Sequence, residues 1–426
     1  MSTELINSLP EKTRDLLQQI GTLADEQKVQ AYIVGGIVRD LFLKRDNFDV
    51  DIVIEKDAIA FAQSITEALK GQLLRHERFG TATITLSDNS KIDFATARKE
   101  AYPQPGALPV VGPGTIKDDL QRRDFTINAL AMKINKEAFG ALVDHCGGAD
   151  DINNKLIRVL HDGSFIDDPT RILRAVRFAT RFDFPIEDHT DRLIRAAVKS
   201  DVFTTISPTR IWRELQYILK EPNTKKYMQA MSHYTLQFLH PGLKFAASAT
   251  KLFESIEQNV VWFNEKLSNK RTLDTWLIYF LGLLDVLAEK EVREIVEKFQ
   301  LKDGEKKRIF SYRGVDCREL FRTLLQEGIA PSRVYKELES LSYEVMLFIR
   351  AKTFDEKIKK RIDEFLTIHK GTVIEITGDD LKALGAKPGK HFEKILNEIL
   401  YKKIDGELIS KEDEIRLAKV LIKKIR

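Results

Sequence analysis

The chain is poor in cysteine, because only Cys146 and Cys317 occur among its 426 residues. Two cysteines so far apart cannot build a disulfide framework, and they are too few for a cysteine-based zinc cluster. A reducing compartment, the cytoplasm, is therefore the expected location of the protein.

Long apolar runs are missing as well. No window of the sequence approaches the roughly 20 apolar residues that a membrane-spanning helix requires. The opening residues, "MSTELINSLPEKTRDLLQQI", contain acids where a signal peptide would have a cationic start and an apolar stretch. We therefore expect no membrane partner.

A strong charge of one sign is also absent. The 68 Lys and Arg residues against 64 Asp and Glu leave a net charge of +4, which permits a nucleic-acid partner without requiring one. The hydrophobic content of 43% and the charged content of 31% are typical of a soluble globular protein. A chain of this length is expected to form two to four domains.

The pattern of the sequence changes near residue 150. Before this point, strand-like runs such as "AYIVGG", "TATITL" and "KIDFATA" alternate with helical stretches. Beyond Asp151 the pattern is helical almost throughout, with a break at residues 221–223. The segment "HKGTVIEITGDDLKALGAKPGK" indicates a small terminal module.

Two carboxylates stand in the apolar run "DVDIVIE". On a strand, Phe48, Val50, Ile52 and Ile54 would face a core, while Asp49 and Asp51 would share the opposite face. Their α-carbons would lie about 6.5 to 7 Å apart, so both carboxylates could bind one hard cation such as Mg²⁺. The alternative is a half-buried strand whose solvent face carries acids.

A glycine pair precedes these acids in "YIVGGIVRDLFL". A strand, a turn at Gly35 and Gly36, and a helix start would bring together backbone N–H groups that suit a phosphate. Arg39 could bind a triphosphate with its planar guanidinium. A Gly-Gly turn alone is a weak indication. Followed by Asp-x-Asp, however, it indicates nucleotidyl transfer.

Four further motifs follow in order: "RRDFTINALAM", "VDHCGGADDI", "DDPTRILRAVRF" and "SPTRIWREL". The series resembles class II tRNA nucleotidyltransferases of the polymerase β superfamily, with bacterial poly(A) polymerases as close kin. The resemblance implies an α+β protein whose nucleotidyltransferase head, residues 1–150, contains a small mixed or antiparallel sheet. An all-α neck (151–225), body (226–345) and tail (346–426) would follow.

The resemblance also implies an activity. Such enzymes add C and A, or only the terminal A, to the 3′ end of tRNA from CTP and ATP, without a nucleic-acid template and with release of pyrophosphate. Two Mg²⁺ ions held by Asp49 and Asp51 would assist the transfer. Asp93 in "KIDFATAR" supplies a third acid on a neighbouring predicted strand. Many relatives carry Glu there, so we expect Asp93 to support the site rather than bind metal directly.

The motif "RRDFTINALAM" would contact the sugar and the phosphates. The resemblance implies that Asp124 accepts a hydrogen bond from a ribose hydroxyl, with Arg123 and Asn128 completing the contacts. Asp124 would also be a good N-cap for a helix over "FTINALAM", and both roles are compatible. The segment "VDHCGGADDI" is interpreted either as a hinge between head and neck or as a plain turn.

The motif "DDPTRILRAVRF" would select the base. Cytosine and adenine present an amino group beside an acceptor ring nitrogen, whereas uracil and guanine present a carbonyl beside an N–H. Asp168 and Arg171, three apart on one helical face, have the side chains to accept C and A and to reject U and G. Arg174 and Arg177 would continue this stripe toward the phosphates. The alternative is a capped helix with a solvated arginine face, and relatives usually have Glu at the position of Asp167.

The segment "TARKEAYPQPGALPVVGPGTIKDD" is rich in Pro and Gly. We expect a long loop without clear secondary structure, and such loops are usually functional or mobile. Its Arg98-Lys99-Glu100 resembles the basic-x-acidic lever with which A-adding members re-aim the base-selecting pair. The alternative is a surface loop with an incidental charge pair.

Other functions fit parts of this pattern. A bacterial-type poly(A) polymerase shares the head, and a catalytically inactive tRNA-binding protein would keep the overall domains. The acceptor stem and the elbow of tRNA are the expected partners, and the tail would clamp the elbow. A Pro-Gly-Lys turn at Gly389, Lys390 and His391 is either a phosphate contact or a simple turn. The sequence does not indicate the oligomeric state, nor whether C is added besides A.

Overall fold

The computed structural model describes residues 2–46, 49–234, 236–269 and 271–425. The chain divides into two compact units, Met1–Leu215 with Ala230–Thr235 and Gln216–Gln229 with Leu236–Arg426. Within the described ranges, no helix combines the length and the apolar character that crossing a membrane requires.

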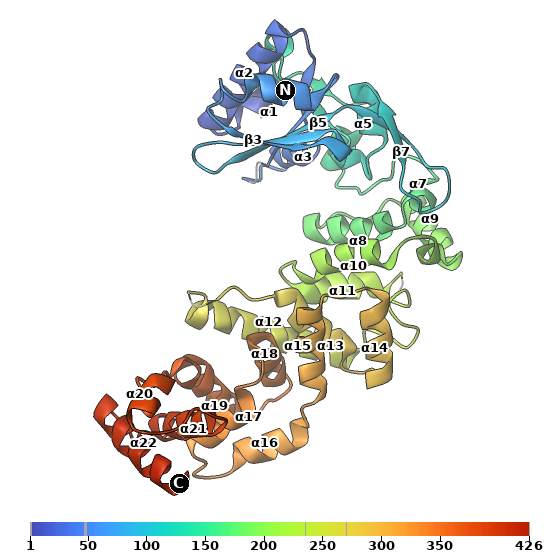
Figure 1. Cartoon of the computed structure of the whole chain (residues 1–426). Helices are drawn as coiled ribbons and strands as arrows, with labels where there is room; N and C mark the ends of the chain where they lie inside the picture. The colour runs from blue at the N-terminus through green and yellow to red at the C-terminus, as the bar shows by residue number, and fades with distance from the viewer. Residues whose placement is uncertain (1, 47–48, 235, 270, 426) are drawn as a thin grey trace. The chain divides into compact units, whose positions relative to one another are not determined.

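A seven-stranded mixed sheet forms the centre of the N-terminal part of the first unit (Figure 1). The strand order is β3-β4-β5-β2-β1-β8-β9, in which β2 and β5 are parallel and the other neighbours are antiparallel. The strands are β1 (Ala31–Val34), β2 (Val50–Ile54), β3 (Gln72–His76), β4 (Thr81–Thr85), β5 (Lys91–Thr96), β8 (Ala131–Lys133) and β9 (Leu142–Val143). The predicted small mixed sheet is confirmed.

The alternation predicted for β2 is present from Val50 onward, and Phe48 lies outside the described residues. Val50, Ile52 and Ile54 are buried in the main core, together with apolar side chains of α2 (Glu11–Glu26) and α4 (Ala58–Ile65). Val53, on the opposite face, belongs to a second cluster with Ile116 and Leu120 of α5 (Ile116–Gln121). Asp51 lies on this second face because it is two residues from Val53. The sheet therefore buries one face against α2 and α4 and presents the acid on the other.

The Pro- and Gly-rich segment after β5 is a β-hairpin, so the expectation of a loop without clear secondary structure was wrong. Strand β6 (Arg98–Ala101) pairs antiparallel with β7 (Val110–Pro113), with Arg98 opposite Pro113 and Ala101 opposite Val110. Proline and glycine lower the strand propensity of this segment, but a ladder to a partner strand satisfies the backbone. The hairpin is visible beside α5 and α7 in Figure 1.

The predicted helix over "FTINALAM" is also absent. A short 3₁₀ turn, η2 (Thr126–Asn128), is followed by β8, which pairs with β1. The side-chain oxygen Oδ1 of Asp124 accepts hydrogen bonds from the backbone N–H of Phe125 and from Asn128 Nδ2. Tertiary pairing of the apolar residues into the sheet therefore outweighs their local helical pattern.

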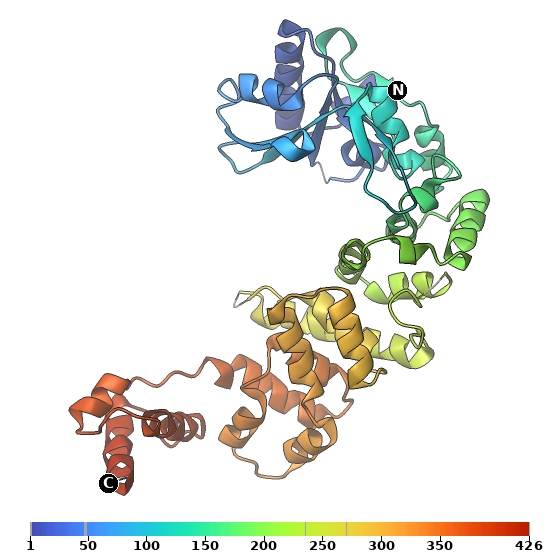
Figure 2. The same ribbon diagram turned by 45° about the vertical axis from the view of Figure 1, so that its right-hand side comes forward.

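Helices make up most of the rest of the first unit (Figure 2). They are α1 (Ser2–Asn7), α3 (Gly36–Phe42), α6 (Gly148–Asn153), α7 (Ser164–Asp167), α8 (Thr170–Phe182), α9 (Asp188–Lys199) and the first two turns of α10 (Pro208–Leu219), with a 3₁₀ turn η4 (Val202–Thr205) before α10. Gly147, just before α6, has a positive φ of +73° that favours glycine. A Cβ on Gly148 would meet the carbonyl oxygen of Thr126 at 2.2 Å. These glycines form a tight turn against η2.

The described part of the second unit consists of helices, as the sequence predicts. They are α12 (Ala247–Leu267), α13 (Thr275–Leu284), α14 (Glu289–Lys298), α15 (Asp303–Arg313), α16 (Cys317–Leu325), α17 (Pro331–Leu338), α18 (Tyr343–Ala351), α19 (Glu356–Thr367), α20 (Gly378–Ala383), α21 (His391–Ile404) and α22 (Lys411–Ile425), while α11 (Thr224–Ser232) has residues in both units. Helices α20 to α22 share a small core that includes Leu381, Ile399 and Ile422.

Helix α8 is joined to the residues before β8 by an ion pair between partly exposed Arg174 and buried Asp124. Arg174 donates from Nε and Nη2 to Oδ2 of Asp124, at 2.8 and 2.6 Å. On its other side, Glu214 of α10 accepts from Arg174 Nη1 at 3.4 Å and from Arg177 Nη2 at 3.3 Å. Phe178 lies beneath both guanidinium groups. Arg174 and Arg177 are therefore packed and paired, so these two arginines do not form a solvated face.

The pKa of Asp124 reflects this pairing. Burial alone would raise the pKa of the carboxyl, but the charge of Arg174, hydrogen bonds from Asn128 and Arg174, and the charge of Arg171 lower it to about 2. In an unfolded chain the pKa of an aspartate is about 3.9. The ionised carboxylate therefore stabilises the folded state above about pH 4, and this stability is lost as the pH falls through the folded pKa.

We predict that Asp124→Asn lowers the free energy of unfolding of the first unit by about 2 kcal/mol at neutral pH. The variant should also show a smaller loss of stability than the wild type between about pH 4 and pH 2. Chemical denaturation at a series of pH values measures both effects. Glu137→Gln, at an exposed carboxylate in the same unit, is the control. An unchanged pH dependence in Asp124→Asn would contradict the role of this pair.

Candidate functional site

A cavity of about 400 Å³ in the first unit brings together residues that are far apart in the sequence. Its lining is rich in arginine and contains most of the predicted nucleotide contacts. The lining residues are Gly35, Gly36, Arg39, Glu100, Tyr102, Arg122, Arg123, Asp124, Asn128, Asp168, Arg171, Arg174 and Phe178. A strongly cationic cavity of this volume suits a small polyanion.

The glycine turn after β1 forms one wall of this cavity. Gly35 has a φ of +66°, and a Cβ there would lie 2.5 Å from Nη1 of Arg123. Only glycine therefore fits without displacing this arginine. Arg39, one turn into α3, donates from Nη1 to Asn128 Oδ1 at 2.5 Å and packs on the ring of Phe182. The turn and Arg39 thus line the cavity, and their contact with a phosphate stays a prediction.

The carboxylates of Asp51 and Asp93 lie on adjacent strands. In the parallel pairing of β2 with β5, Asp51 is directly opposite Asp93. Both line a second cavity of about 480 Å³, which also includes Arg122 and Arg123 and is therefore next to the first. Thr83 Oγ1 donates to Asp93 Oδ1 at 2.5 Å. Asp49 precedes β2 and is exposed.

The charge of this acidic pair is only partly compensated. Desolvation within the cavity and the negative charges of Asp93 and Asp49 raise the pKa of Asp51 to about 6, against the opposing charge of Arg123. A divalent cation would relieve this repulsion. Within the described ranges, no group of three or more His, Cys, Asp or Glu side chains is arranged to hold a metal. The carboxylate of Asp51, with Asp93 beside it, fits a divalent cation whose remaining ligands come from substrate oxygens and water.

Asp168 and Arg171 both line the arginine-rich cavity, but they do not share a helical face. Asp168 has an extended backbone between α7 and α8, because its Oδ1 accepts from Thr170 N at 3.0 Å and from Thr170 Oγ1 at 2.6 Å. Arg171 lies in the first turn of α8. Its Nη1 donates to Ser164 Oγ at 2.7 Å and its Nη2 to the carbonyl oxygen of Arg122 at 2.8 Å. These separate hydrogen bonds, rather than helical spacing, bring both side chains to the cavity.

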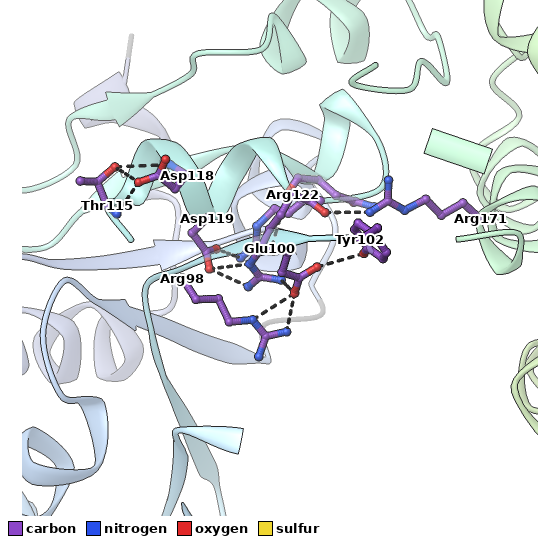
Figure 3. Close-up of polar contacts among 10 residues, drawn as sticks. Arg98, Glu100, Tyr102, Thr115, Asp118, Asp119, Arg122 and Arg171 are labelled. Atoms are coloured by element: carbon purple, nitrogen blue, oxygen red, sulfur yellow. Dashed lines mark hydrogen bonds and ion pairs between the residues drawn. The ribbon is translucent and has the colours of Figure 1, made fainter. Parts of the chain in front are cut away.

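Glu100 of the hairpin is the centre of a hydrogen-bond network at the cavity wall (Figure 3). Its Oε1 accepts from Arg98 Nη2 at 2.7 Å and from Arg122 Nη1 at 3.3 Å, and its Oε2 accepts from Tyr102 at 3.0 Å. Because the carbonyl of Arg122 holds Arg171, the network connects β6 to the guanidinium of Arg171. Arg98 itself does not line either cavity described above.

Sequence reasoning missed several residues of this site. Tyr102, Ser164 and Arg122 hold Glu100 and Arg171 in place, and buried Asp119 binds both Arg122 and Arg123. Arg122 could have been found, because it begins the motif that contains Arg123. Tyr102, Ser164 and Asp119 carry no such signal. Arg177 binds Glu214 and does not line the cavity, so its contact with phosphates stays a prediction.

Family models match three parts of the chain. The model described as "Poly A polymerase head domain" matches residues 31–158, and "tRNA nucleotidyltransferase domain 2 putative" matches residues 275–418. Residues 183–246 match "Probable RNA and SrmB- binding site of polymerase A". The nucleotidyltransferase family to which these domains point depends in general on a divalent metal ion.

Two curated relatives are similar over nearly the whole chain. An A-adding tRNA nucleotidyltransferase of Geobacter sulfurreducens is 37% identical over 96% of this chain and 47% of its own length. An A-adding tRNA nucleotidyltransferase of Halalkalibacterium halodurans is 32% identical over 95% of this chain and 91% of its own length. The chain therefore spans about half of the first relative and nine tenths of the second.

Solved structures show the same fold. The apo form II of a CCA-adding enzyme superposes with a TM-score of 0.81 at 35% identity, covering 99% of this chain and 98% of that one. The Thermotoga maritima CCA-adding enzyme complexed with tRNA superposes with a TM-score of 0.74 at 32% identity, covering 100% and 98%. Together with the match to the Halalkalibacterium enzyme, these similarities show that the chain belongs to the family of tRNA nucleotidyltransferases.

Proposed function

We propose that the protein adds A to the 3′ end of tRNA, with addition of C before A as the wider form of the same activity. One observation carries the proposal: the glycine turn with Arg39 and the Asp168–Arg171 pair line a single cavity beside the acids of β2 and β5. The A-adding relatives of Geobacter, Halalkalibacterium and Aquifex aeolicus, the last 32% identical over 88% of this chain, support the narrower form.

The proposed reaction is a displacement at phosphorus. The 3′-hydroxyl of the acceptor attacks the α-phosphorus of the triphosphate, the bond to the bridging oxygen breaks, and pyrophosphate leaves while the hydroxyl proton passes to solvent. Arg39 and Arg123 bind the negatively charged phosphates at the glycine turn. Two Mg²⁺ ions at Asp49 and Asp51 would supply activation of the hydroxyl and neutralisation of the leaving group, with Asp93 supporting Asp51.

Recognition of the nucleotide falls to the other side of the cavity. The carboxylate of Asp168 accepts from the amino group of A or C, and the guanidinium of Arg171 donates to the neighbouring ring nitrogen. Uracil and guanine would leave both side chains unpaired, at a cost of about 1 to 3 kcal/mol per partner. Asp124, held by Arg174 and Asn128, accepts from the ribose hydroxyl.

The direct test uses two tRNA substrates. One ends at the discriminator base and the other ends in CC, and each is offered the four labelled nucleoside triphosphates separately. An A-adding enzyme extends only the second substrate, and only with ATP. An enzyme that adds C and A extends the first with CTP alone and the second with ATP alone. Transfer to neither substrate would contradict the proposal.

A poly(A) polymerase is the second candidate, because two of the matching family models are named after that enzyme. Such an enzyme would add many A residues to an RNA that lacks the tRNA fold. An unstructured RNA offered with ATP distinguishes the two activities. Binding of tRNA without any transfer would instead favour an inactive tRNA-binding protein.

We predict that Asp49→Asn and Asp51→Asn each abolish nucleotide addition, because these carboxylates hold the metal ions. Affinity for tRNA should stay within a few-fold, because the acids do not bind RNA. Single-turnover assays in Mg²⁺ and filter binding of tRNA measure the two properties. Asp88→Asn, on the β4–β5 turn, is the matched control with normal activity. Substantial turnover by either variant would overturn the metal assignment.

We predict that Asp168→Ala and Arg171→Ala each weaken selection against U and G by about 1 to 3 kcal/mol. The measurement compares kcat/KM for the four triphosphates on tRNA ending in CC. If both variants keep the selectivity of the wild type, other residues choose the base.

We predict that Arg98 and Glu100 of the hairpin are needed for addition of A. Since Glu100 holds Arg122, whose carbonyl holds Arg171, the double variant Arg98→Ala/Glu100→Ala should depress A addition to tRNA ending in CC. Binding of that tRNA should change far less, and any addition of C should persist. Rates of A and C addition and the Kd of the tRNA are measured in parallel. Equal loss of both additions, or loss of neither, would refute a lever role for the hairpin.

A further inference from the structure

The tip of the β6–β7 hairpin is bound to the helical segment that carries Asp168. The backbone N–H of Gly106 donates to the carbonyl oxygen of Ile166 at 3.0 Å. Gly106 has a φ of +68°, and a Cβ there would lie 2.5 Å from the backbone and side-chain oxygens of Thr205. The chain therefore requires glycine at this position both for its conformation and for the close approach to η4.

Arg210 connects this tip to Asp168. From the first turn of α10, its Nη1 donates to the carbonyl oxygen of Gly106 at 2.8 Å. Its Nη2 lies 2.9 Å from Oδ1 of Asp168. Both side chains of the ion pair are partly shielded, with 25% of Arg210 and 20% of Asp168 exposed. One planar guanidinium therefore binds a backbone oxygen of the hairpin and a carboxylate at the cavity at the same time.

These contacts divide the two oxygens of Asp168 between different tasks. Oδ1 receives Arg210 together with the backbone N–H and the hydroxyl of Thr170. Among the described residues, the protein donates no hydrogen bond to Oδ2. Asp168 lines the arginine-rich cavity, so Oδ2 is the oxygen left for a ligand. The orientation of the carboxylate is set by Arg210 and Thr170.

We propose that Arg210 is a positioning residue for base selection, because it fixes Asp168 against the tip of the hairpin. The inference rests on the proposed function, in which Asp168 accepts from the amino group of the base. The hairpin then has two separate connections to Asp168 and Arg171. Glu100 is connected to Arg171 through Arg122. Gly106 is connected to Asp168 through Arg210. Removal of the second connection releases the carboxylate to rotate, and the discrimination of adenine from guanine falls.

The test compares Gly106→Ala with Arg210→Gln. Each variant removes one end of the connection and leaves Asp168, Arg171 and the acids of the sheet in place. The measured quantity is the ratio of kcat/KM for ATP to that for GTP on tRNA ending in CC. Both triphosphates are purines, so the ratio reports the hydrogen-bonding edge of the base. We expect the ratio to fall by about 10-fold or more in each variant, as for misplacement of a contacting group.

The double variant Gly106→Ala/Arg210→Gln tests whether the two residues act together. If Gly106 and Arg210 act through one connection, their effects do not add. The ATP to GTP ratio of the double variant should then be no lower than the lower of the two single-variant ratios. Arg210→Lys keeps a charge beside Asp168 but offers a single nitrogen, so its ratio should lie between those of the wild type and Arg210→Gln. This milder variant also serves if Arg210→Gln folds poorly.

Matched controls separate this effect from general strain. Gly328→Ala places alanine at a φ of +65° where no atom lies within 4 Å of the added Cβ. Arg293→Gln removes an exposed arginine of α14 that pairs with Glu289. Both should keep the ATP to GTP ratio of the wild type. A merely structural Arg210 would lower kcat for both nucleotides equally and leave the ratio unchanged, and that result would overturn the proposal.

Equilibrium binding of ATP and GTP to the protein alone is measured by calorimetry in parallel. This readout does not require transfer to tRNA, so it distinguishes failure of the proposed function from failure of the inference. Loss of the binding preference in Arg210→Gln and Gly106→Ala supports the role of Arg210 even if the acceptor is another RNA. An unchanged preference in both variants refutes it.

Discussion

The buried carboxylate of Asp124 is the contact on which the geometry of the site depends. It joins the residues before β8 to α8 through Arg174, and to η2 through Asn128, which in turn holds Arg39 of the glycine turn. The glycine-turn side and the α8 side of the cavity are thereby connected to one carboxylate. Leaving such a group without its partner costs far more than the pair itself contributes, so the pair is difficult to lose by single substitutions.

Most of the arginines that line the cavity are paired with an acidic side chain of the protein. Asp119 pairs with Arg122 and Arg123, Glu214 pairs with Arg174, and Asp40 pairs with Arg39. These internal anions keep the guanidinium groups in place before a nucleotide arrives. A site that is organised in advance spends less of its binding energy on ordering side chains.

The sequence predicts the parts of the fold that follow a simple period. In β2, the alternation of Val50, Ile52 and Ile54 matches the core face, and Asp51 lies opposite it. The prediction from sequence fails where tertiary pairing outweighs local preference. Residues Ala131–Lys133 form a strand rather than the end of a helix. The hairpin strands were not predicted because neighbouring Pro and Gly lower the strand propensity of the segment. Asp168 lines the cavity, but the predicted helical spacing was wrong, because Thr170 and Arg210 orient this side chain. Tyr102 and Ser164 could not be predicted, since nothing local marks a residue whose partner lies on another element.

The two halves of the site are held by different kinds of bond. Asp51 and Asp93 occupy a parallel ladder, so their separation is set by backbone hydrogen bonds that do not depend on neighbouring side chains. Asp168 and Arg171 are held by the side chains of Thr170, Arg210 and Ser164 and by one carbonyl. Under the proposed function, substitution of a few side chains would therefore change which nucleotide is accepted while the acids stay where they are. Nucleotide preference could then diverge among descendants, or be re-engineered, without rebuilding the part proposed to perform the transfer.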